Sequence, residues 1–512
     1  MSGRLRLGEW TTLRDRAMMN RIDSHLSSRD GGFRCASGGT VMANPEKLHA
    51  DTYPNRKSPY ESVEEPMAAE AEALDAWFTG LLVWFGPVMT AFARISDPRN
   101  PKRIKHQLVV VLVFGVLLFL TQCTSRREGN RQLTEPKSRT TLQAAFPQLD
   151  SVPHMDTVAN VLEQIPPSEV EAVLTDTIKR LLRNRRLKNW MVQQRYLIAI
   201  DGTLKWSGVE QHAEEMLEKH SANGATIYQV YGVEAVLVGP QGIAIPFLTE
   251  FCANSEERTE ETKQDSELKA FRRLAKRLRA LFPKLPLTIL ADGLYPNGPL
   301  FALLRAYRWD FMIVLQAGNL PTWQDDARRM HKLERHNTVA APWGDRSQKI
   351  WWVNNVPYDW YDPEDKKWHT TVLHFVQCVE TWTDAAGDHQ STWTWVSGKP
   401  FTRANVLDRC NRMARHRWDI EEHILVEKHL GYEYKHLYSR DWNAMQGFHH
   451  LMHIAHLLHI LVLHQTTLYP MVQRLTIRGT IKKLIEAARD SGVDKARIAR
   501  LGERQHKPRL VW

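Results

Sequence analysis

Two long apolar stretches stand out in the first part of the chain. Residues 76–93 carry no charge, and residues 108–120 form a continuous apolar run. The second run is shorter than the about 20 residues that a bilayer requires, and Gly86-Pro87 interrupts the first. We therefore expect a buried helical hairpin and keep a membrane anchor as the less favoured alternative.

A further helix is predicted from Asp156 to Asn189, with Asp156-Thr157 as N-cap residues. Its last part is strongly basic and contains Lys179, Arg180, Arg183, Arg185, Arg186 and Lys188. Charge runs of this kind are usually solvated helix faces. The density of this run makes a phosphate-contacting surface an equally good interpretation.

The hydrophobic period then changes from that of a helix to that of strands. The pattern predicts strands and helices in the order strand, strand, strand, helix, strand, helix, strand. The strands are 196–201, 226–237, 243–248, 287–292 and 310–315, and the helices are 266–282 and 299–307. This is the order of elements in a ribonuclease-H-like α/β fold, in which the first strand lies centrally beside the fourth.

The remaining chain predicts further units. Residues 317–400 are rich in tryptophan and β-like, which indicates an inserted β subdomain whose tryptophans are mainly core residues. The pattern is helical again from Arg403 to His464. The predicted organisation is a disordered leader (1–65), a helical domain (66–194), a catalytic core (195–316), the β-rich insertion (317–400), the second part of the core (401–465) and a basic tail (466–512).

Two acids end apolar strands, Asp201 and Asp292. In open α/β sheets the active site lies at the carboxyl ends of the strands. If the two strands are neighbours, their carboxylates repel one another until a divalent cation binds, and hard oxygen ligands suit Mg²⁺ or Mn²⁺. A single Asp-Gly after a strand is more simply a turn, so the argument depends on there being two.

Arg417, Glu421 and Lys428 are separated by four and seven residues. At about 3.6 residues per turn, these offsets place all three on one helix face. An acid flanked by two cations can hold metal while the cations bind phosphate oxygens. The plainer interpretation is an ordinary surface ion-pair ladder.

These segments resemble the catalytic motifs of bacterial insertion-sequence DDE transposases. The segments are AIDGT (199–203), ILADGLYPN (289–297) and RWDIEEHILVEK (417–428). The last one resembles the Y-x2-R-x3-E-x6-K signature, whose tyrosine position is occupied by Ala414. Residues 97–120 resemble the helical associated domain of some of these enzymes, and a β-rich insertion before the glutamate is also a feature of the group.

The resemblance implies an enzyme that cuts and joins double-stranded DNA at the ends of an insertion sequence and at its target. Asp201, Asp292 and Glu421 would bind two Mg²⁺ (or Mn²⁺) ions about 3.5–4 Å apart. Arg417 and Lys428 would hold phosphate, and a homodimer would pair two DNA ends. A ribonuclease-H-like nuclease without joining activity and a domesticated DNA-binding protein are the alternatives.

Composition adds modest support. The chain of 512 residues has 68 Lys and Arg against 58 Asp and Glu, a net charge of +10 that weakly favours a polyanionic partner. The five cysteines are scattered singly, at positions 35, 123, 252, 378 and 410, so neither a disulfide framework nor a zinc knuckle is indicated. We expect a cytoplasmic, nucleoid-associated protein with no signal peptide and no membrane association.

The predicted helix 448–464 carries six histidines: His449, His450, His453, His456, His459 and His464. Because this helix is otherwise apolar and has no acids or cysteines of its own, packing and DNA-side polar contacts are favoured over a zinc site. Glu422 and Glu427 lie off the predicted catalytic face and are not expected to be ligands. Tyr432, Lys435 and His436 are weaker candidates for contact with a DNA end.

Overall fold

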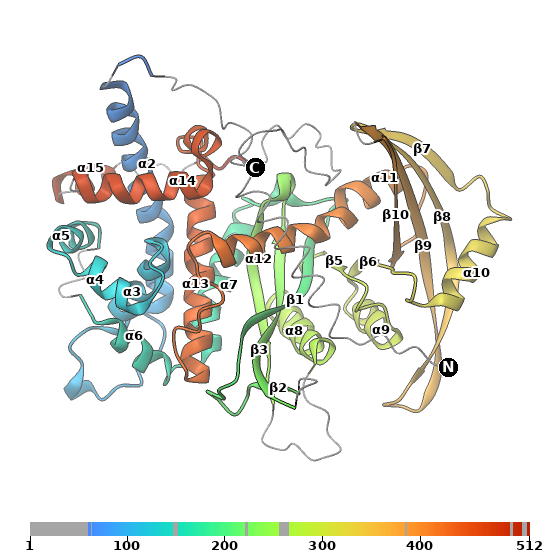
Figure 1. Cartoon of the computed structure of the whole chain (residues 1–512), viewed down its shortest axis with the longest axis horizontal. Coiled ribbons are helices and arrows are strands. Elements are labelled where there is room, and N and C mark those ends of the chain that lie inside the picture. The colour runs from blue at the N-terminus through green and yellow to red at the C-terminus, as the bar shows by residue number, and fades with distance from the viewer. Residues whose placement is uncertain are drawn as a thin grey trace.

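The computed structural model describes residues 60–62, 64–146, 152–220, 224–254, 266–384, 387–491, 495–503 and 509–512. The predicted leader therefore lies largely outside the described residues. Helices gather on one side of the molecule, the mixed α/β core lies in the middle, and a curved sheet forms the other side (Figure 1).

The helical side is built from both ends of the chain. Helix α13 runs through it and packs against α2, α3, α6 and α7, while α14 and α15 pack against α2. The helices of this side are α2 (Glu64–Phe92), α3 (Leu108–Leu120), α4 (Arg126–Leu133), α5 (Pro136–Ala145), α6 (Met155–Leu162), α7 (Pro167–Arg183), α13 (Trp442–Leu463), α14 (Tyr469–Ser491) and α15 (Lys495–Glu503). Short 3₁₀ turns occur at Pro101–Arg103 and Lys188–Trp190.

The two apolar stretches form the helices α2 and α3, which pack against each other. Every residue of α3 except Val109 is buried. Among the described helices, only α2 has the length and composition to cross a membrane, and half of its most apolar window is buried inside the protein. The predicted pair of buried apolar helices is therefore present.

The single helix predicted from Asp156 to Asn189 is wrong. The chain forms α6 and α7, and Pro166-Pro167 separates them because proline lacks the amide hydrogen that a continuing helix needs. The N-cap of α6 is His154 rather than Asp156. Its ring nitrogen Nδ1 accepts a hydrogen bond from the amide of Asp156 at 3.2 Å.

The core sheet has the strand order β4-β3-β1-β5-β6. Strand β1 pairs antiparallel with β3 and parallel with β5, and β5 pairs parallel with β6. The strands are β1 (Tyr196–Gly208), β2 (Leu217–His220), β3 (Thr226–Val238), β4 (Ala244–Cys252), β5 (Leu287–Ala291) and β6 (Asp310–Val314), with a 3₁₀ turn at Pro240–Gly242. This is the ribonuclease-H-like arrangement that the sequence predicts, extended by the short strand β2, which the sequence pattern did not reveal.

Helices cover both faces of the core sheet. Helices α8 (Glu267–Leu281) and α9 (Gly298–Ala306) share a core with Ile198 and Ile289, whereas α12 (Asp419–His429) packs against the neighbouring residues Leu197 and Ala199. Successive side chains of a strand point to opposite faces, so α12 lies on the face opposite α8 and α9.

The insertion continues the core sheet instead of forming a separate one. Its last strand, β10 (Gly387–Ser397), pairs antiparallel with β6, and the order continues through β9 (Lys367–Asp384) and β8 (Arg346–Asp362) to β7 (Thr338–Trp343). It also contains a helix, α10 (Pro321–His331), that the β-like pattern did not predict. Trp352, Trp360 and Trp395 are buried as expected, but Trp368 is 73% exposed.

The chain returns from the insertion through irregular helical turns. The short α11 (Val406–Asp408) is followed by a π turn (Arg409–Met413), a 3₁₀ turn (Ala414–Trp418) and α12. The predicted helical stretch from Arg403 to His464 is therefore broken, both here and again between α12 and α13. Such non-α turns inside helices are frequent at functional sites.

Buried ion pairs fix these turns to the sheet. Arg409 Nη1 lies 2.8 Å from Asp310 Oδ2 on β6, and both side chains are buried. Arg415 and Arg346 both pair with the fully buried Glu380 on β9. The path of the chain into α12 is thus set by ion pairs whose carboxylates are fully buried.

The Arg409–Asp310 pair generates a stability prediction. We expect Arg409→Met to lower the free energy of unfolding by about 3–5 kcal/mol, because it leaves the carboxylate of Asp310 buried without its partner charge. Urea unfolding followed by circular dichroism measures this loss. The double variant Arg409→Met/Asp310→Leu should recover most of it. If the double variant is as unstable as the single one, loss of the charge partner is not the cause.

Candidate active site

Asp201 lies within β1 and not at its end. The strand continues to Gly208, so the predicted end of the strand at Asp201 is wrong. The parallel pairing with β5, however, covers only Tyr196 to Ala199, and beyond it β1 is paired on the β3 side alone. The carboxylate is 6% exposed and stands where the parallel part of the sheet ends.

The strand register brings the two predicted aspartates to the same level. Ala199 pairs with Leu290, and Asp201 and Asp292 each follow two residues later. Burial is the main cause of the raised pKa of the buried Tyr295 hydroxyl, and the negative charges of Glu267, Asp201 and Asp292 raise this pKa further. The sheet edge thus gathers acidic groups around one tyrosine.

Glu267, at the start of α8, is a site residue that sequence reasoning missed. Its carboxylate accepts hydrogen bonds from Tyr231 Oη at 2.6 Å and Tyr295 Oη at 2.8 Å. The only sequence signal is its place after the N-cap residue Ser266, which indicates a helix start and not a site. A side chain at Gly202 would overlap the carboxylate of Glu267 and the hydroxyl of Tyr231, so this glycine allows a close approach within a strand and does not form a turn.

Helix α12 carries Glu421 over the face of the sheet to which Asp201 points. Ile420 and Ile424 of α12 pack in the same core cluster as Leu197 and Ala199, which share their side of β1 with Asp201. Further along the helix, Lys428 Nζ donates a hydrogen bond to Thr203 Oγ1 at 3.0 Å. The helix is therefore held against β1 on both sides of Asp201.

Arg417 and Glu421 form the expected pair across one turn. Arg417 Nη2 lies 2.6 Å from Glu421 Oε1, although Arg417 belongs to the 3₁₀ turn that precedes α12. The guanidinium is 2% exposed and lies under the ring of Trp418, 3.8 Å from its centre. Ala414, at the tyrosine position of the signature, is buried in the core cluster of Ile420.

The described residues contain three groups of at least three acidic or histidine side chains whose ligand atoms all lie within 4.8 Å of one another. Asp201, Asp292 and Glu421 are not one of these groups. The structure places them on one edge of the sheet and under one helix without bringing all their oxygens this close. In enzymes without substrate, catalytic contacts are often long and shorten when the substrate binds.

The histidines of α13 are buried, so the expected DNA-side contacts for them are wrong. Two acids from elsewhere in the chain meet them, Glu234 from β3 and Glu427 from α12. Tyr432 is also buried, and this contradicts its predicted contact with DNA. The sequence of this helix shows histidines in an apolar background. It does not reveal the acidic partners that other elements bring to them.

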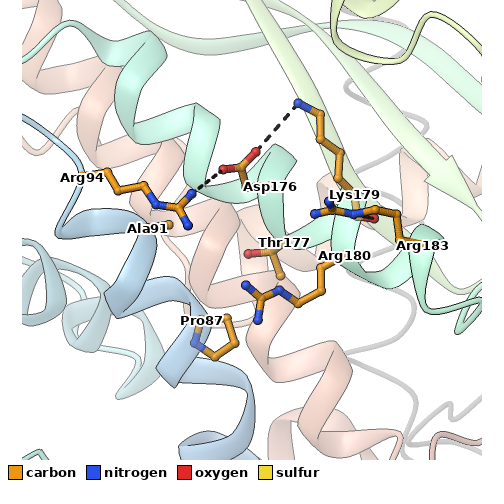
Figure 2. Close-up of a pocket in the computed structure, with 8 residues that line it drawn as sticks. All are labelled: Pro87, Ala91, Arg94, Asp176, Thr177, Lys179, Arg180 and Arg183. Atoms are coloured by element: carbon orange, nitrogen blue, oxygen red, sulfur yellow. Dashed lines mark hydrogen bonds and ion pairs between the residues drawn. The ribbon is translucent and has the colours of Figure 1, made fainter.

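Part of the basic run on α7 lines a pocket beside α2 (Figure 2). Lys179, Arg180 and Arg183 meet Arg94 there, and Asp176 pairs with Arg94 at 3.7 Å and with Lys179 at 3.8 Å. The pocket therefore has more cations than anions. Arg180 is exposed and points toward Pro87 on the opposite wall.

Family comparisons agree with these elements. Residues 89–178 match the family described as DDE_Tnp_1-associated, and residues 258–458 match the Transposase DDE domain. Asp292, Glu421 and Lys428 lie inside the second match, whereas Asp201 precedes it. A comparison with curated proteins gives no match.

The tight space around Gly202 generates a prediction. We expect Gly202→Ala to lower the free energy of unfolding by about 1–3 kcal/mol, because the added methyl group must displace Glu267 or Tyr231 from a packed position. Chemical denaturation measures the effect. Gly318→Ala is the matched control, because nothing lies within 4 Å of a Cβ atom at that position. Equal stability of both variants would contradict the close approach.

Proposed function

The chain belongs to the DDE transposases, enzymes that cleave DNA and transfer its strands, and we propose that Asp201, Asp292 and Glu421 are its catalytic carboxylates. One observation carries this assignment. The register of β1 and β5 places both aspartates at the same level of the sheet, and α12 lies over the same face with Glu421 in its first turn. The element order matches a ribonuclease-H-like core.

The proposed site suits hard divalent cations such as Mg²⁺ or Mn²⁺. All three proposed ligands are carboxylates, and oxygen donors are the ligands that these ions prefer. Asp201 and Asp292 also act together with Glu267 on the pKa of Tyr295, which shows that negative charge accumulates at this edge. When bound, a pair of divalent ions would supply Lewis-acid activation of the attacking oxygen and stabilisation of the leaving oxygen.

We assign different roles to the two cations of the motif. Arg417 is buried under Trp418 and bonded to Glu421, so it positions this carboxylate and balances its charge. Lys428 is partly exposed and contacts Thr203, two residues after Asp201. It therefore lies where a DNA phosphate would approach the carboxylates, and its point charge suits such a contact.

Lys428 would hold the scissile phosphate by its charge, and the three carboxylates would hold the divalent ions that offset the charge of the phosphate and of the attacking oxygen. Water is the nucleophile for cleavage, and a DNA 3′-hydroxyl is the nucleophile for joining. The joining step distinguishes this proposal from a nuclease that only cuts. We further propose that double-stranded DNA is bound by a homodimer, which pairs two element ends, and that the enzyme acts at the nucleoid in the cytoplasm.

The basic pocket between α2 and α7 is a second proposed contact with DNA. Four of its lining residues (Ala91, Arg94, Asp176 and Thr177) lie in the part of the chain that matches the transposase-associated family, and its α7 cations directly follow that match. Phosphate groups would compete with Asp176 for the surrounding cations. Such contacts strengthen binding without reading the DNA sequence.

The catalytic assignment predicts the behaviour of Asp292→Asn. We expect this variant to lose cleavage and strand transfer by about 10²-fold or more while it still binds DNA, because removing a group that stabilises the transition state affects the reaction and not the ground-state complex. Labelled DNA carrying the element's own ends, incubated with Mg²⁺, provides the assay. Asp345→Asn, an exposed acid in the β7–β8 turn, should retain activity. Full activity of Asp292→Asn would place the site elsewhere.

The basic pocket predicts a change in the salt dependence of DNA binding. Arg180→Ala should weaken binding similarly for all DNA sequences and reduce the slope of log K against log salt by about 1, because one phosphate contact and its released counterion are lost. Fluorescence anisotropy at several salt concentrations measures this slope. Lys367→Ala, an exposed cation at the start of β9, is the charge-matched control. An equal change in both variants would indicate a general charge effect only.

A further inference from the structure

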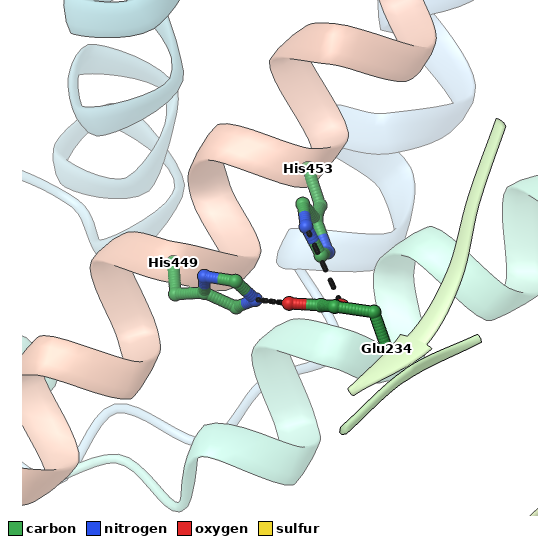
Figure 3. Close-up of side chains that lie close together, drawn as sticks. All are labelled: Glu234, His449 and His453. Carbon is green, nitrogen blue, oxygen red and sulfur yellow. Dashed lines mark ion pairs between the residues drawn. The ribbon is translucent and has the colours of Figure 1, made fainter. Parts of the chain in front are cut away.

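A cluster of histidines and glutamates is buried between the sheet, α12 and α13. Glu234 comes from β3, Glu427 from α12, and His449 and His453 from successive turns of α13. None of these side chains is more than 3% exposed. Figure 3 shows both imidazole rings directed toward the carboxylate of Glu234. The ligand atoms of Glu234, His449 and His453 all lie within 4.8 Å of one another, and Glu427 joins them through His453. We propose that this cluster is a transition-metal site, best suited to Zn²⁺.

The ligand atoms are spaced as they would be around a metal, although His449 Nε2 also lies within hydrogen-bond distance of Thr249 Oγ1, at 3.0 Å. His449 Nε2 lies 3.3 Å from Glu234 Oε1, and His453 Nε2 lies 3.4 Å from Glu427 Oε2 and 4.0 Å from Glu234 Oε2. A good N–H···O bond measures about 2.9 Å. Zinc bonds of about 2.0–2.2 Å in a tetrahedron place neighbouring ligand atoms about 3.3 Å apart, so two of these three separations match the edges of such a site and the third is longer.

Several polar atoms of the cluster lack a hydrogen-bond partner among the described residues. They are both ring nitrogens of His453, Nδ1 of His449 and Oε2 of Glu427. Buried polar groups are nearly always satisfied, because an unpaired one has lost its water without compensation. A metal bound between His449, His453, Glu234 and Glu427 would satisfy Nε2 of His453 and the open carboxylate oxygen of Glu427. His449 would bind it through Nε2, the nitrogen that faces Glu234.

The donor types select the metal. Two imidazoles and two carboxylates suit Zn²⁺, whereas Mg²⁺ prefers oxygen ligands and retains its waters. The two histidines are four residues apart, which places them on one face of α13. Sequence analysis disfavours a zinc site on this helix, because the helix has no acids of its own and both acids come from other elements, β3 and α12.

Surrounding groups orient the proposed ligands as outer partners do in metal sites. His456 Nδ1 lies 2.8 Å from Glu427 Oε1, and His423 Nε2 lies 3.2 Å from the same atom. On the other carboxylate, Tyr434 Oη donates to Glu234 Oε1 at 2.9 Å and Thr249 Oγ1 donates to Oε2 at 2.7 Å. Each carboxylate is thus held in place before a metal binds.

A buried cation lies beside the cluster. Lys205 Nζ donates a hydrogen bond to the carbonyl of Tyr434 at 2.8 Å. The hydroxyl of the same tyrosine donates to Glu234.

The site would join the elements that carry the proposed catalytic residues. Glu234 is the direct cross-strand partner of Asp201, and Glu427 shares α12 with Glu421. A bound zinc would tie this helix to the sheet next to the carboxylate edge. Only this consequence rests on the proposed function. Metal binding itself rests on the cluster alone.

Metal content tests the proposal directly. Full-length protein is purified from zinc-supplemented cells, and its metals are measured by mass spectrometry. We expect about one zinc per chain in the wild type, a loss of most of it in Glu234→Gln and His453→Ala, and its retention in His453→Cys, because thiolate is also a zinc ligand. His450→Ala is the matched control, because this buried histidine of the same helix lies outside the cluster.

A second measurement needs no variant of the cluster. A strong chelator should lower the melting temperature of the wild type, and added Zn²⁺ should restore it. Asp292→Asn should keep its zinc even though it no longer cuts DNA, which separates this site from the proposed catalytic one. A wild type that retains no zinc and is indifferent to the chelator would show that the cluster holds only protons. Loss of zinc in Asp292→Asn, with retention in His453→Ala, would also overturn the proposal.

Discussion

The short parallel pairing of β1 with β5 is the contact on which the rest of the site depends. It fixes Asp201 and Asp292 at one level, and it ends two residues before them. Because β1 then continues beside β3 alone, the carboxylates stand at an opening in an otherwise continuous sheet. A shift of one residue in this register would turn Asp201 to the opposite face, away from α12. The proposed third carboxylate, Glu421, lies over the same face as Asp201 only because this register is kept.

The β-rich insertion returns the chain to the sheet beside β6, next to the end of the β1–β5 pairing. Its strand β10 pairs with β6, and the turns that follow are fixed to the sheet by Arg409 with Asp310 and by Arg415 with Glu380. Buried ion pairs contribute little net stability, since losing water offsets their attraction, but they penalise every arrangement that separates the partners. They therefore define the direction in which α12 begins, and with it the position of Glu421.

The strands of the core sheet and their order could be predicted from the sequence, because they follow from local hydrophobic patterns. The acids at 201 and 292, the helix 266–282 and the spacing of Arg417, Glu421 and Lys428 are all readable along the chain. Contacts between distant segments were not readable. Helix α13 contains no acid of its own, and Glu234 and Glu427 reach its histidines only through the fold. The role of Glu267 could not be predicted, because it depends on tertiary contacts with Tyr231 and Tyr295. The break at Pro166-Pro167 is a local signal, but the helical pattern on both sides of it outweighed it.

Two kinds of acidic group thus share one face of the sheet, and burial separates their chemistry. Asp292 and Glu421 are partly exposed, which suits ions that keep water and exchange with substrate. Glu234, directly opposite Asp201, is fully enclosed by α12 and α13 and faces imidazoles. A charge enclosed in this way must be compensated by the protein itself, and the compensation then holds the enclosing helices in place. The deeper acids would therefore organise the helices, while Asp292 and Glu421 remain open to DNA beside the buried Asp201.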